Sequence, residues 1–179
     1  MYYKIAVTGP ESSGKTTLAL ALADALDAAY AEEYARAYLQ ERDGQYTESD
    51  LMAIARGQQA LEDALVATGR SFHLCDTDMV VLKVWSEFRF GRTDSFIDLA
   101  VRQRRYDLTL LCLPDIPWQP DPLRENPDDR MVLLAHYRRA LAQSGAHVVE
   151  IGGSDFSSRL QCALEAIAHG WKQKQGSPS

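Results

Sequence analysis

The stretch that decides the fold is Gly9-Pro10-Glu11-Ser12-Ser13-Gly14-Lys15-Thr16-Thr17. It fits the phosphate-binding pattern G-x-x-x-x-G-K-[ST] of a P-loop. Gly9 and Gly14 can adopt backbone conformations that residues with a Cβ avoid, so successive N–H groups can turn inward and surround an anion. In this pattern Lys15 reaches the β- and γ-phosphates, and the hydroxyl of Thr16 binds Mg²⁺. The stretch therefore predicts a site for the phosphates of a nucleotide.

The residues on both sides of this loop supply the context that the pattern requires. Residues 3–8 are short and largely apolar, as expected of a buried parallel strand. After the loop, Leu18, Leu22 and Leu26 recur every four residues, as on one face of a helix. A chance match is the alternative, and the flanking strand and helix count against it. We expect a nucleotide, ATP or GTP, to contact Gly9, Glu11, Ser12, Ser13, Gly14, Lys15, Thr16 and Thr17.

Length and composition limit the class of protein. At 179 residues the chain has the size of one domain, and its net charge of −6 counts against general nucleic-acid binding. No apolar run approaches the ~20 residues of a membrane-spanning helix, and no signal peptide precedes the first strand. Cys75, Cys112 and Cys162 form no metal or disulfide pattern, so we expect buried free thiols. These features predict a cytoplasmic domain at residues 1–172 and a flexible C-terminal tail at 173–179.

Strand-like and helix-like segments alternate along the rest of the chain. We expect further strands at residues 28–32, 72–75, 107–113 and 146–151, with helical stretches between them. This alternation predicts a three-layer α/β fold of the P-loop NTPase type, with a mainly parallel, five-stranded sheet and helices on both faces.

Ligands of such sheets lie beyond the carboxyl ends of the strands. The residues that follow the five strands should therefore meet at one crevice. They are the P-loop, the pair Glu32 and Glu33, Asp76-Thr77-Asp78, the segment from Asp115, and Gly152-Gly153-Ser154. From this last group we expect Gly153 to contact the nucleotide.

Two acidic positions at this crevice are candidates for the chemistry. Asp76 directly follows an apolar strand, where an acid can hold Mg²⁺ or its water, and capping the next helix is the alternative. Glu33 follows the second strand, where it could accept the proton of an acceptor hydroxyl, although a first-turn glutamate also stabilises a helix through the dipole. Which of the two is the base stays open. Arg36, one turn after Glu33, either binds substrate or pairs with Glu33.

Residues 115–130 are the second distinctive feature, because the segment is rich in proline and charge and is too long for an ordinary connection. We expect it to close as a lid over the nucleotide. Either Arg124 or Arg130 could then stabilise the transferred phosphoryl group, and Trp118 offers a face for stacking a planar or cationic ring. The alternative is a solvated loop pinned by one buried tryptophan. We assign other large aromatic residues to the core: Trp85, Phe88, Phe90 and Trp171.

The same motifs occur in the same order in NadR-type ribosylnicotinamide kinases, which this chain resembles over nearly its whole length. The resemblance implies phosphorylation of the 5′-hydroxyl of nicotinamide riboside by ATP and Mg²⁺, giving nicotinamide mononucleotide for NAD salvage. It also implies that Trp118 stacks on the nicotinamide ring and that Asp115 and Asp121 help to hold the substrate. The matching stretches are residues 9–17, Glu33-Tyr34-Ala35-Arg36, Asp76-Thr77-Asp78, Tyr106-Asp107-Leu108, Asp115-Ile116-Pro117-Trp118 and Arg124-Glu125-Asn126.

Bifunctional members of this family carry an adenylyltransferase domain before the kinase, and some carry a DNA-binding domain. Since this chain begins two residues before its first expected strand, we expect the kinase activity alone. A kinase for another nucleoside and a nucleotide-dependent regulatory NTPase are the alternatives. We expect a small nucleoside as substrate and neither nucleic acid nor membrane as partner; the exact acceptor, the phosphate donor and the oligomeric state stay open.

Overall fold

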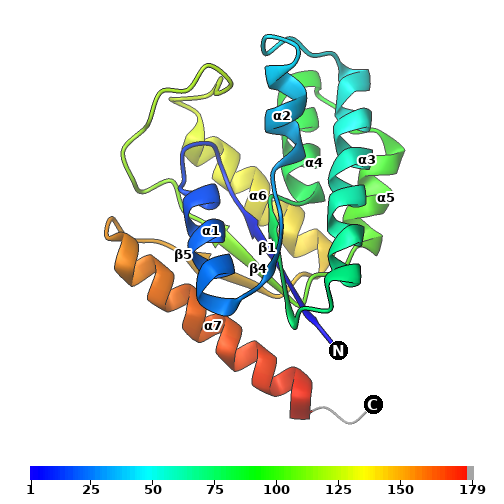
Figure 1. The fold of residues 1–179 in the computed structure, drawn as a ribbon. Helices are drawn as coiled ribbons and strands as arrows, with labels where there is room; N and C mark the ends of the chain where they lie inside the picture. The colour runs from blue at the N-terminus through cyan, green and yellow to red at the C-terminus, as the bar shows by residue number, and fades with distance from the viewer. Residues whose placement is uncertain (177–179) are drawn as a thin grey trace.

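Five parallel strands form the centre of the molecule (Figure 1). The computed structural model describes residues 1–176. The strands lie in the order β2-β3-β1-β4-β5, and every pairing is parallel. The predicted α/β fold is therefore confirmed, with a wholly parallel sheet. The strands are β1 (Tyr3–Thr8), β2 (Ala29–Ala31), β3 (Phe72–Asp76), β4 (Leu108–Cys112) and β5 (Val148–Ile151).

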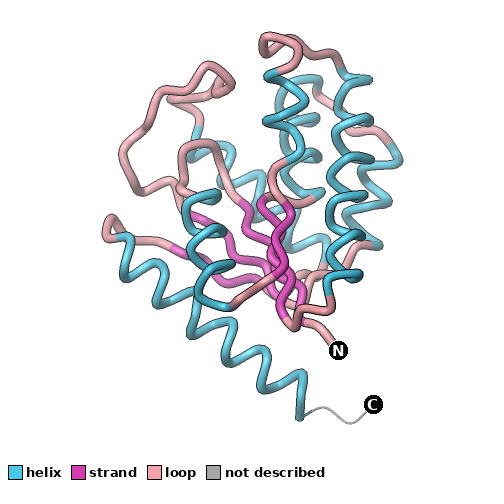
Figure 2. Tube along the Cα trace, in the orientation of Figure 1, coloured by secondary structure: helices cyan, strands magenta, loops and turns pink. Residues whose placement is uncertain are grey.

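Helices cover both faces of this sheet, as Figure 2 shows. On one face α1 (Lys15–Leu26) and α7 (Phe156–Gly176) pack against the apolar side chains of β1 and β4. A second core cluster lies on the opposite face. Because both faces are covered, β4 is buried along its whole length. The second cluster draws on α2 (Tyr34–Gln40), α3 (Glu48–Ala64), α4 (Met79–Phe90), α5 (Ser95–Gln103) and α6 (Arg130–Ser144), and a short 3₁₀ helix, η1 (Leu65–Thr68), follows α3.

The sequence patterns placed the elements well, and the differences lie at their ends. Thr47 and Asp50 form the capping box at the start of α3. At the start of α7 the side chain of Asp155 accepts a hydrogen bond from the backbone N–H of Ser158 at 2.7 Å. None of the helices within residues 1–176 has both the length and the apolar character to cross a bilayer.

Two expectations about the C-terminal part were wrong. Helix α7 continues to Gly176, past the expected start of the tail at residue 173, and residues 177–179 lie outside the described residues. Lys174 fixes this last part of the helix because its ammonium donates to both carboxylate oxygens of Asp107, at 2.6 and 2.7 Å. Cys162 is exposed, unlike the buried Cys75 and Cys112, because it lies on the outer face of α7.

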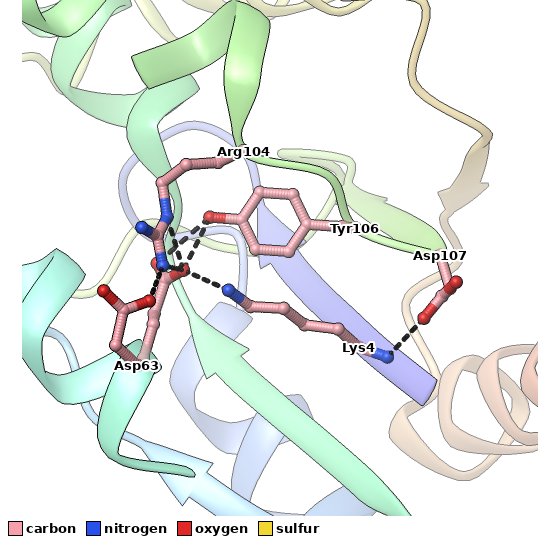
Figure 3. A network of polar contacts seen from close by, with 6 residues as sticks. Lys4, Asp63, Arg104, Tyr106 and Asp107 are labelled. Carbon is pink, nitrogen blue, oxygen red and sulfur yellow. Dashed lines mark hydrogen bonds and ion pairs between the residues drawn. The ribbon is translucent and has the colours of Figure 1, made fainter. Parts of the chain in front are cut away.

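A buried charged network fixes the amino ends of the strands, away from the P-loop (Figure 3). The carboxylate of Glu62 on α3 is fully buried and accepts from the ammonium of Lys4 at 2.8 Å. It also accepts from the guanidinium of Arg104 at 3.2 Å and from the hydroxyl of Tyr106 at 3.0 Å. Asp107 accepts from the backbone N–H of Lys4 at 2.7 Å. The Tyr106-Asp107 part of the matched motifs therefore ties β4 to β1 and α3.

Candidate active site

A cavity of about 700 Å³ lies at the carboxyl ends of the strands, where ligands of parallel α/β sheets bind. The P-loop, α2, α4, α6, the start of α7 and the loop between β4 and α6 all contribute to its wall. Many residues expected at the site line it: Glu11, Ser12, Ser13, Gly14, Lys15, Thr16, Thr17, Glu33, Arg36 and Arg124. Other expected residues do not line it: Gly9, Asp76, Asp115, Trp118, Asp121, Arg130 and Gly153.

The P-loop passes tightly over the end of β4. Gly9 has a φ of 136°, and a Cβ there would lie 2.5 Å from the carbonyl oxygen of Cys112, so only glycine fits. Gly14 has a φ of 81° immediately before α1. The ammonium of Lys15 and the hydroxyl of Ser13 both donate to the carbonyl of Pro10, at 2.9 and 2.7 Å. The loop is thus a defined backbone turn at the N-terminus of a helix, where an anion is favoured.

Asp76 is buried beside the P-loop, at the end of β3. Its Oδ2 accepts a hydrogen bond from the hydroxyl of Tyr30 at 3.1 Å, while its Oδ1 has no partner among the described residues. Burial raises the pKa of Asp76, and the neighbouring Thr16 hydroxyl and Lys15 ammonium partly offset that rise. An unpartnered carboxylate oxygen beside a hydroxyl suits Mg²⁺, which prefers oxygen ligands.

The helix-capping alternative for Asp76 belongs instead to Asp78. The Oδ1 of Asp78 accepts from the backbone N–H of Val81 at 3.1 Å and from the hydroxyl of Thr8 at 3.0 Å. Asp78 therefore caps α4 and leaves the carboxylate of Asp76 free of that structural role.

Glu33 lies at the cavity wall, immediately before α2. Its side chain makes no capping hydrogen bond to the N–H groups at the start of α2. Burial raises the pKa of Glu33, and the positive charge of Lys15 works against that rise while the negative charge of Asp76 adds to it. The fold thus brings Glu33, Lys15 and Asp76 together from three separate strand ends.

Arg36 does not pair with Glu33. Its guanidinium donates to Oδ2 of Asp121 at 3.0 Å, and the backbone N–H of Leu123 donates to the other oxygen of Asp121 at 2.9 Å. These two hydrogen bonds lower the pKa of Asp121. The pair joins α2 to the segment expected to act as a lid.

This lid segment, residues 115–130, also contacts the P-loop directly. The carboxylate of Glu11 accepts hydrogen bonds from the backbone N–H groups of Glu125 and Asn126, both at 3.1 Å. The hydroxyl of Ser12 accepts from the backbone N–H of Gln119 at 2.9 Å. The lid therefore lies over the P-loop and is fastened to it by two P-loop side chains.

Trp118 lies on the lid but does not line the cavity. The guanidinium carbons of Arg124 and Arg130 lie 5.9 and 5.8 Å from the centre of its ring, within the range of cation–π contacts. Arg130 also donates to the carbonyl of Ile116 at 2.9 Å, whereas Arg124 donates to the carbonyl of Gln119 and reaches the cavity wall. Of the two expected cations, Arg124 is thus the one exposed to a ligand.

Two further expected ligand residues contact a buried arginine that sequence reasoning missed. Arg159 on α7 is 3% exposed, and its guanidinium donates to Oδ1 of Asp115 at 2.7 Å and to the carbonyl of Gly153 at 3.2 Å. The backbone N–H of Gly153 donates to the other oxygen of Asp115 at 2.6 Å. Asp115 and Gly153 therefore form one cluster with Arg159, whose side chain also contributes to the cavity wall.

Aromatic side chains assigned to the core also form part of the cavity wall. Trp85 and Phe88 on α4 pack against the core cluster and also form part of the cavity wall. The ring of Tyr46 lies 4.8 Å from that of Trp85, and its hydroxyl donates to the carboxylate of Glu125 on the lid at 2.7 Å. Trp85 and Phe88 have a helical spacing that is the same for residues facing the core and for residues facing a cavity. The sequence therefore could not show that these two side chains reach a ligand site.

A family profile described as an AAA domain matches residues 4–159. Two curated relatives are each named trifunctional NAD biosynthesis/regulator protein NadR. The relative from Salmonella typhimurium (strain LT2) is 28% identical over 171 residues, and that from Escherichia coli (strain K12) is 29% identical over 171 residues. Each match covers 91% of this chain and 41% of the relative, so the chain spans about two fifths of their length.

Solved structures show the same fold. The crystal structure of NadR protein in complex with NAD and AMP-PNP has a TM-score of 0.78 and 25% identity, covering 94% of this chain and 49% of that one. A deoxyadenosine kinase from M. mycoides has a TM-score of 0.67 at 11% identity, covering 93% of this chain and 99% of that one. The three-layer architecture is thus that of P-loop nucleoside and nucleotide kinases.

Proposed function

Because the chain belongs to the AAA-domain family and is a NadR-like P-loop kinase domain, we propose that it transfers the γ-phosphoryl group of ATP to the 5′-hydroxyl of nicotinamide riboside. One observation carries this proposal: the wall of the cavity combines the P-loop, aromatic rings and the carboxylate of Glu33. The P-loop forms the part of the wall that we call the donor end, and Tyr46, Trp85 and Phe88 form the part that we call the aromatic end. Such a cavity suits a phosphate donor and an aromatic acceptor together.

The donor end is built for a polyphosphate. Lys15 and the N–H groups of the P-loop bind the phosphates. Thr16 and Asp76 would hold Mg²⁺, which when bound neutralises charge on the phosphates. Arg124, on the lid side of the cavity, stabilises the charge of the transferred group.

Glu33 is the proposed base. It lies on the cavity wall, while the buried Asp76 does not line the cavity and accepts a hydrogen bond from Tyr30 on one oxygen. The raised pKa of Glu33 makes its carboxylate a stronger proton acceptor than an ordinary glutamate. Glu33 accepts the proton of the acceptor hydroxyl as that oxygen bonds to the γ-phosphorus and ADP leaves.

The aromatic end supports a nucleoside whose base is a flat cation. The rings of Tyr46, Trp85 and Phe88 offer faces and edges for such a base, and the carboxylate of Glu125 beside Tyr46 adds an opposite charge. The pyridinium ring of nicotinamide riboside has these properties. In this arrangement the base binds at α4, and Trp118 keeps its contacts with Arg124 and Arg130.

The test is phosphate transfer from Mg·ATP to nicotinamide riboside, alongside purine and pyrimidine nucleosides and a control without acceptor. We expect nicotinamide mononucleotide to form, and nicotinamide riboside to be the best acceptor by kcat/KM. A Lys15→Ala variant with unchanged thermal unfolding should lose the transfer. Faster transfer to another nucleoside would reassign the acceptor, and ATP hydrolysis that ignores every acceptor would favour a regulatory NTPase.

A further inference from the structure

Side chains hold three carbonyl groups of the P-loop. The carbonyl of Pro10 accepts from Ser13 and Lys15, as described above. The carbonyl of Ser12 accepts from the guanidinium of Arg130 at 3.3 Å, and the carbonyl of Ser13 accepts from the guanidinium of Arg159 at 2.7 Å. Two of these carbonyls are therefore held by arginines that come from α6 and α7, far from the loop in sequence.

Holding a carbonyl also sets the direction of the next N–H group. No peptide bond among the described residues is cis, and in a planar trans peptide the C=O and the following N–H point in opposite directions. Because the Ser13 carbonyl points at Arg159, the N–H of Gly14 points to the opposite side of the loop. Inward-pointing N–H groups of this kind are what bind a phosphate in a P-loop.

Arg159 is itself held in place. It is 3% exposed, one guanidinium nitrogen bonds Ser13, and the other bonds Asp115 and Gly153. Asp115 is the ion-pair partner and is anchored in turn by the N–H of Gly153. A planar guanidinium bonded at both ends has little freedom to turn, so it can fix the plane of the peptide that it contacts.

We propose that Arg159 is a positioning residue for the nucleotide phosphates: it holds the Ser13 carbonyl so that the Gly14 N–H stays turned into the phosphate site. Asp115 and Gly153 act through Arg159 by fixing its guanidinium. This inference rests on the proposed function only in taking a nucleoside triphosphate as the donor. It gives Asp115 a role in donor binding, whereas the family resemblance places it at the acceptor.

The test measures binding of inorganic triphosphate and of nicotinamide riboside separately, by calorimetry, to the full chain. Arg159→Met removes the hydrogen bond to Ser13 and should weaken triphosphate binding about ten- to a hundredfold. Binding of nicotinamide riboside should change less than about twofold, because in the proposed function its base contacts Tyr46, Trp85 and Phe88 rather than the P-loop. Arg138→Met is the matched control, since Arg138 is an exposed arginine on α6 that pairs with Glu150.

Two further variants keep the test decisive. Arg159→Lys keeps the charge but donates from a single nitrogen, so we expect an intermediate loss of triphosphate affinity even if the Met variant fails to fold. Asp115→Asn should weaken triphosphate binding and leave nicotinamide riboside binding unchanged. If Asp115→Asn instead weakens nicotinamide riboside binding and leaves triphosphate binding unchanged, Asp115 contacts the acceptor and does not act through Arg159.

The outcome for Arg159 is separable from the outcome for the acceptor. Normal triphosphate binding by folded Arg159 variants would overturn the positioning role, whatever the acceptor is. A general loss of stability would weaken both ligands together, and that pattern would also overturn it. If the unaltered protein binds triphosphate but phosphorylates no nicotinamide riboside, the proposed acceptor is wrong, and the triphosphate affinities of the Arg159 variants still decide the role of Arg159.

Discussion

At the scale of single residues, Glu33 and Asp76 differ in what surrounds them. Glu33 lies on the cavity wall without a capping bond, and Asp76 is buried with one oxygen that has no partner within residues 1–176. The contiguous P-loop could be recognised in the sequence because each of its positions answers to one backbone or phosphate requirement. The role of Arg159 could not be recognised in the sequence, because Arg159 and Ser13 are 146 residues apart and only the folded chain brings them together.

The surroundings of Glu33 predict the pH dependence of turnover. A base must be ionised, and burial raises the pKa of Glu33, so kcat should fall with decreasing pH at values above the usual glutamate pKa of about 4.3. Glu33→Gln should lower kcat about 10²- to 10⁴-fold and remove this acid limb. Asp76→Asn is the comparison, because a metal ligand should chiefly raise the Mg²⁺ concentration needed for turnover. An unchanged kcat in Glu33→Gln would exclude Glu33 as the base.

Asp78 predicts a pH dependence of stability instead. Burial raises its pKa from 3.8 to about 6 in the folded protein, so the folded state binds the proton more tightly than the unfolded state does. This stabilisation is present below about pH 4 and is lost as the pH rises to about 6, with a size on the order of 3 kcal/mol. Asp78→Asn keeps an oxygen for Val81 and Thr8.

The measurement is the free energy of unfolding in urea between pH 4 and pH 8. In the Asp78→Asn variant this contribution should vanish, so the difference in stability between variant and parent should change across that range. Parallel curves for the two proteins would show that Asp78 does not titrate there.

At the scale of elements, α4 is the helix whose apolar face meets both the core and the cavity. The sequence assigns Trp85 and Phe88 to the core, and both pack against it. A helix gives the same spacing to residues that meet the core and to residues that meet a ligand, so the second contact could not be predicted. The structure divides this face, with Leu82 fully in the core and Trp85 and Phe88 reaching the cavity. The lid was easier to foresee, since its length and proline content have no structural purpose in a short connection.

The cavity face of α4 predicts a selective effect on the acceptor. Trp85→Leu should raise KM for nicotinamide riboside about two- to thirtyfold, the range expected for losing a cation–π contact, and should leave KM for ATP unchanged. Trp171→Leu is the matched control: Trp171 on α7 packs against Tyr3 and Phe72 and does not line the cavity. Steady-state kinetics with each substrate varied in turn measures the two KM values. Equal changes in both would contradict binding of the nicotinamide ring at α4.

At the scale of the whole molecule, the candidate active site and the buried Glu62 network lie at opposite ends of the sheet. The cavity lies at the carboxyl ends of the strands, and the Glu62 network lies at their amino ends (Figure 3). The alternation of strands and helices was enough to predict this sheet. The network itself could not be predicted, because a glutamate on a helix is usually expected to face solvent. Only the fold shows that Lys4, Arg104 and Tyr106 surround Glu62.

Removing the charge of Glu62 should destabilise the whole fold. Glu62→Gln leaves Lys4 and Arg104 without their buried partner, which should cost about 3–5 kcal/mol in the free energy of unfolding. Asp63→Asn is the control, because Asp63 contacts the same arginine from a side chain that is 68% exposed and should change stability by less than about 1 kcal/mol. Urea unfolding measures both. An equal effect of the two substitutions would show that the buried position carries no special weight.

The separation of the two ends bears on how such a protein can diversify. Substitutions on α2, α4 and the lid alter the wall of the cavity while the Glu62 network, at the amino ends of β1 and β4, keeps its partners. Substitutions in these three segments can therefore change which acceptor binds during evolution without removing the contacts that stabilise the fold. Substitutions at Lys4, Glu62 or Arg104 offer no such freedom, since each must wait for a compensating change in another segment of the chain.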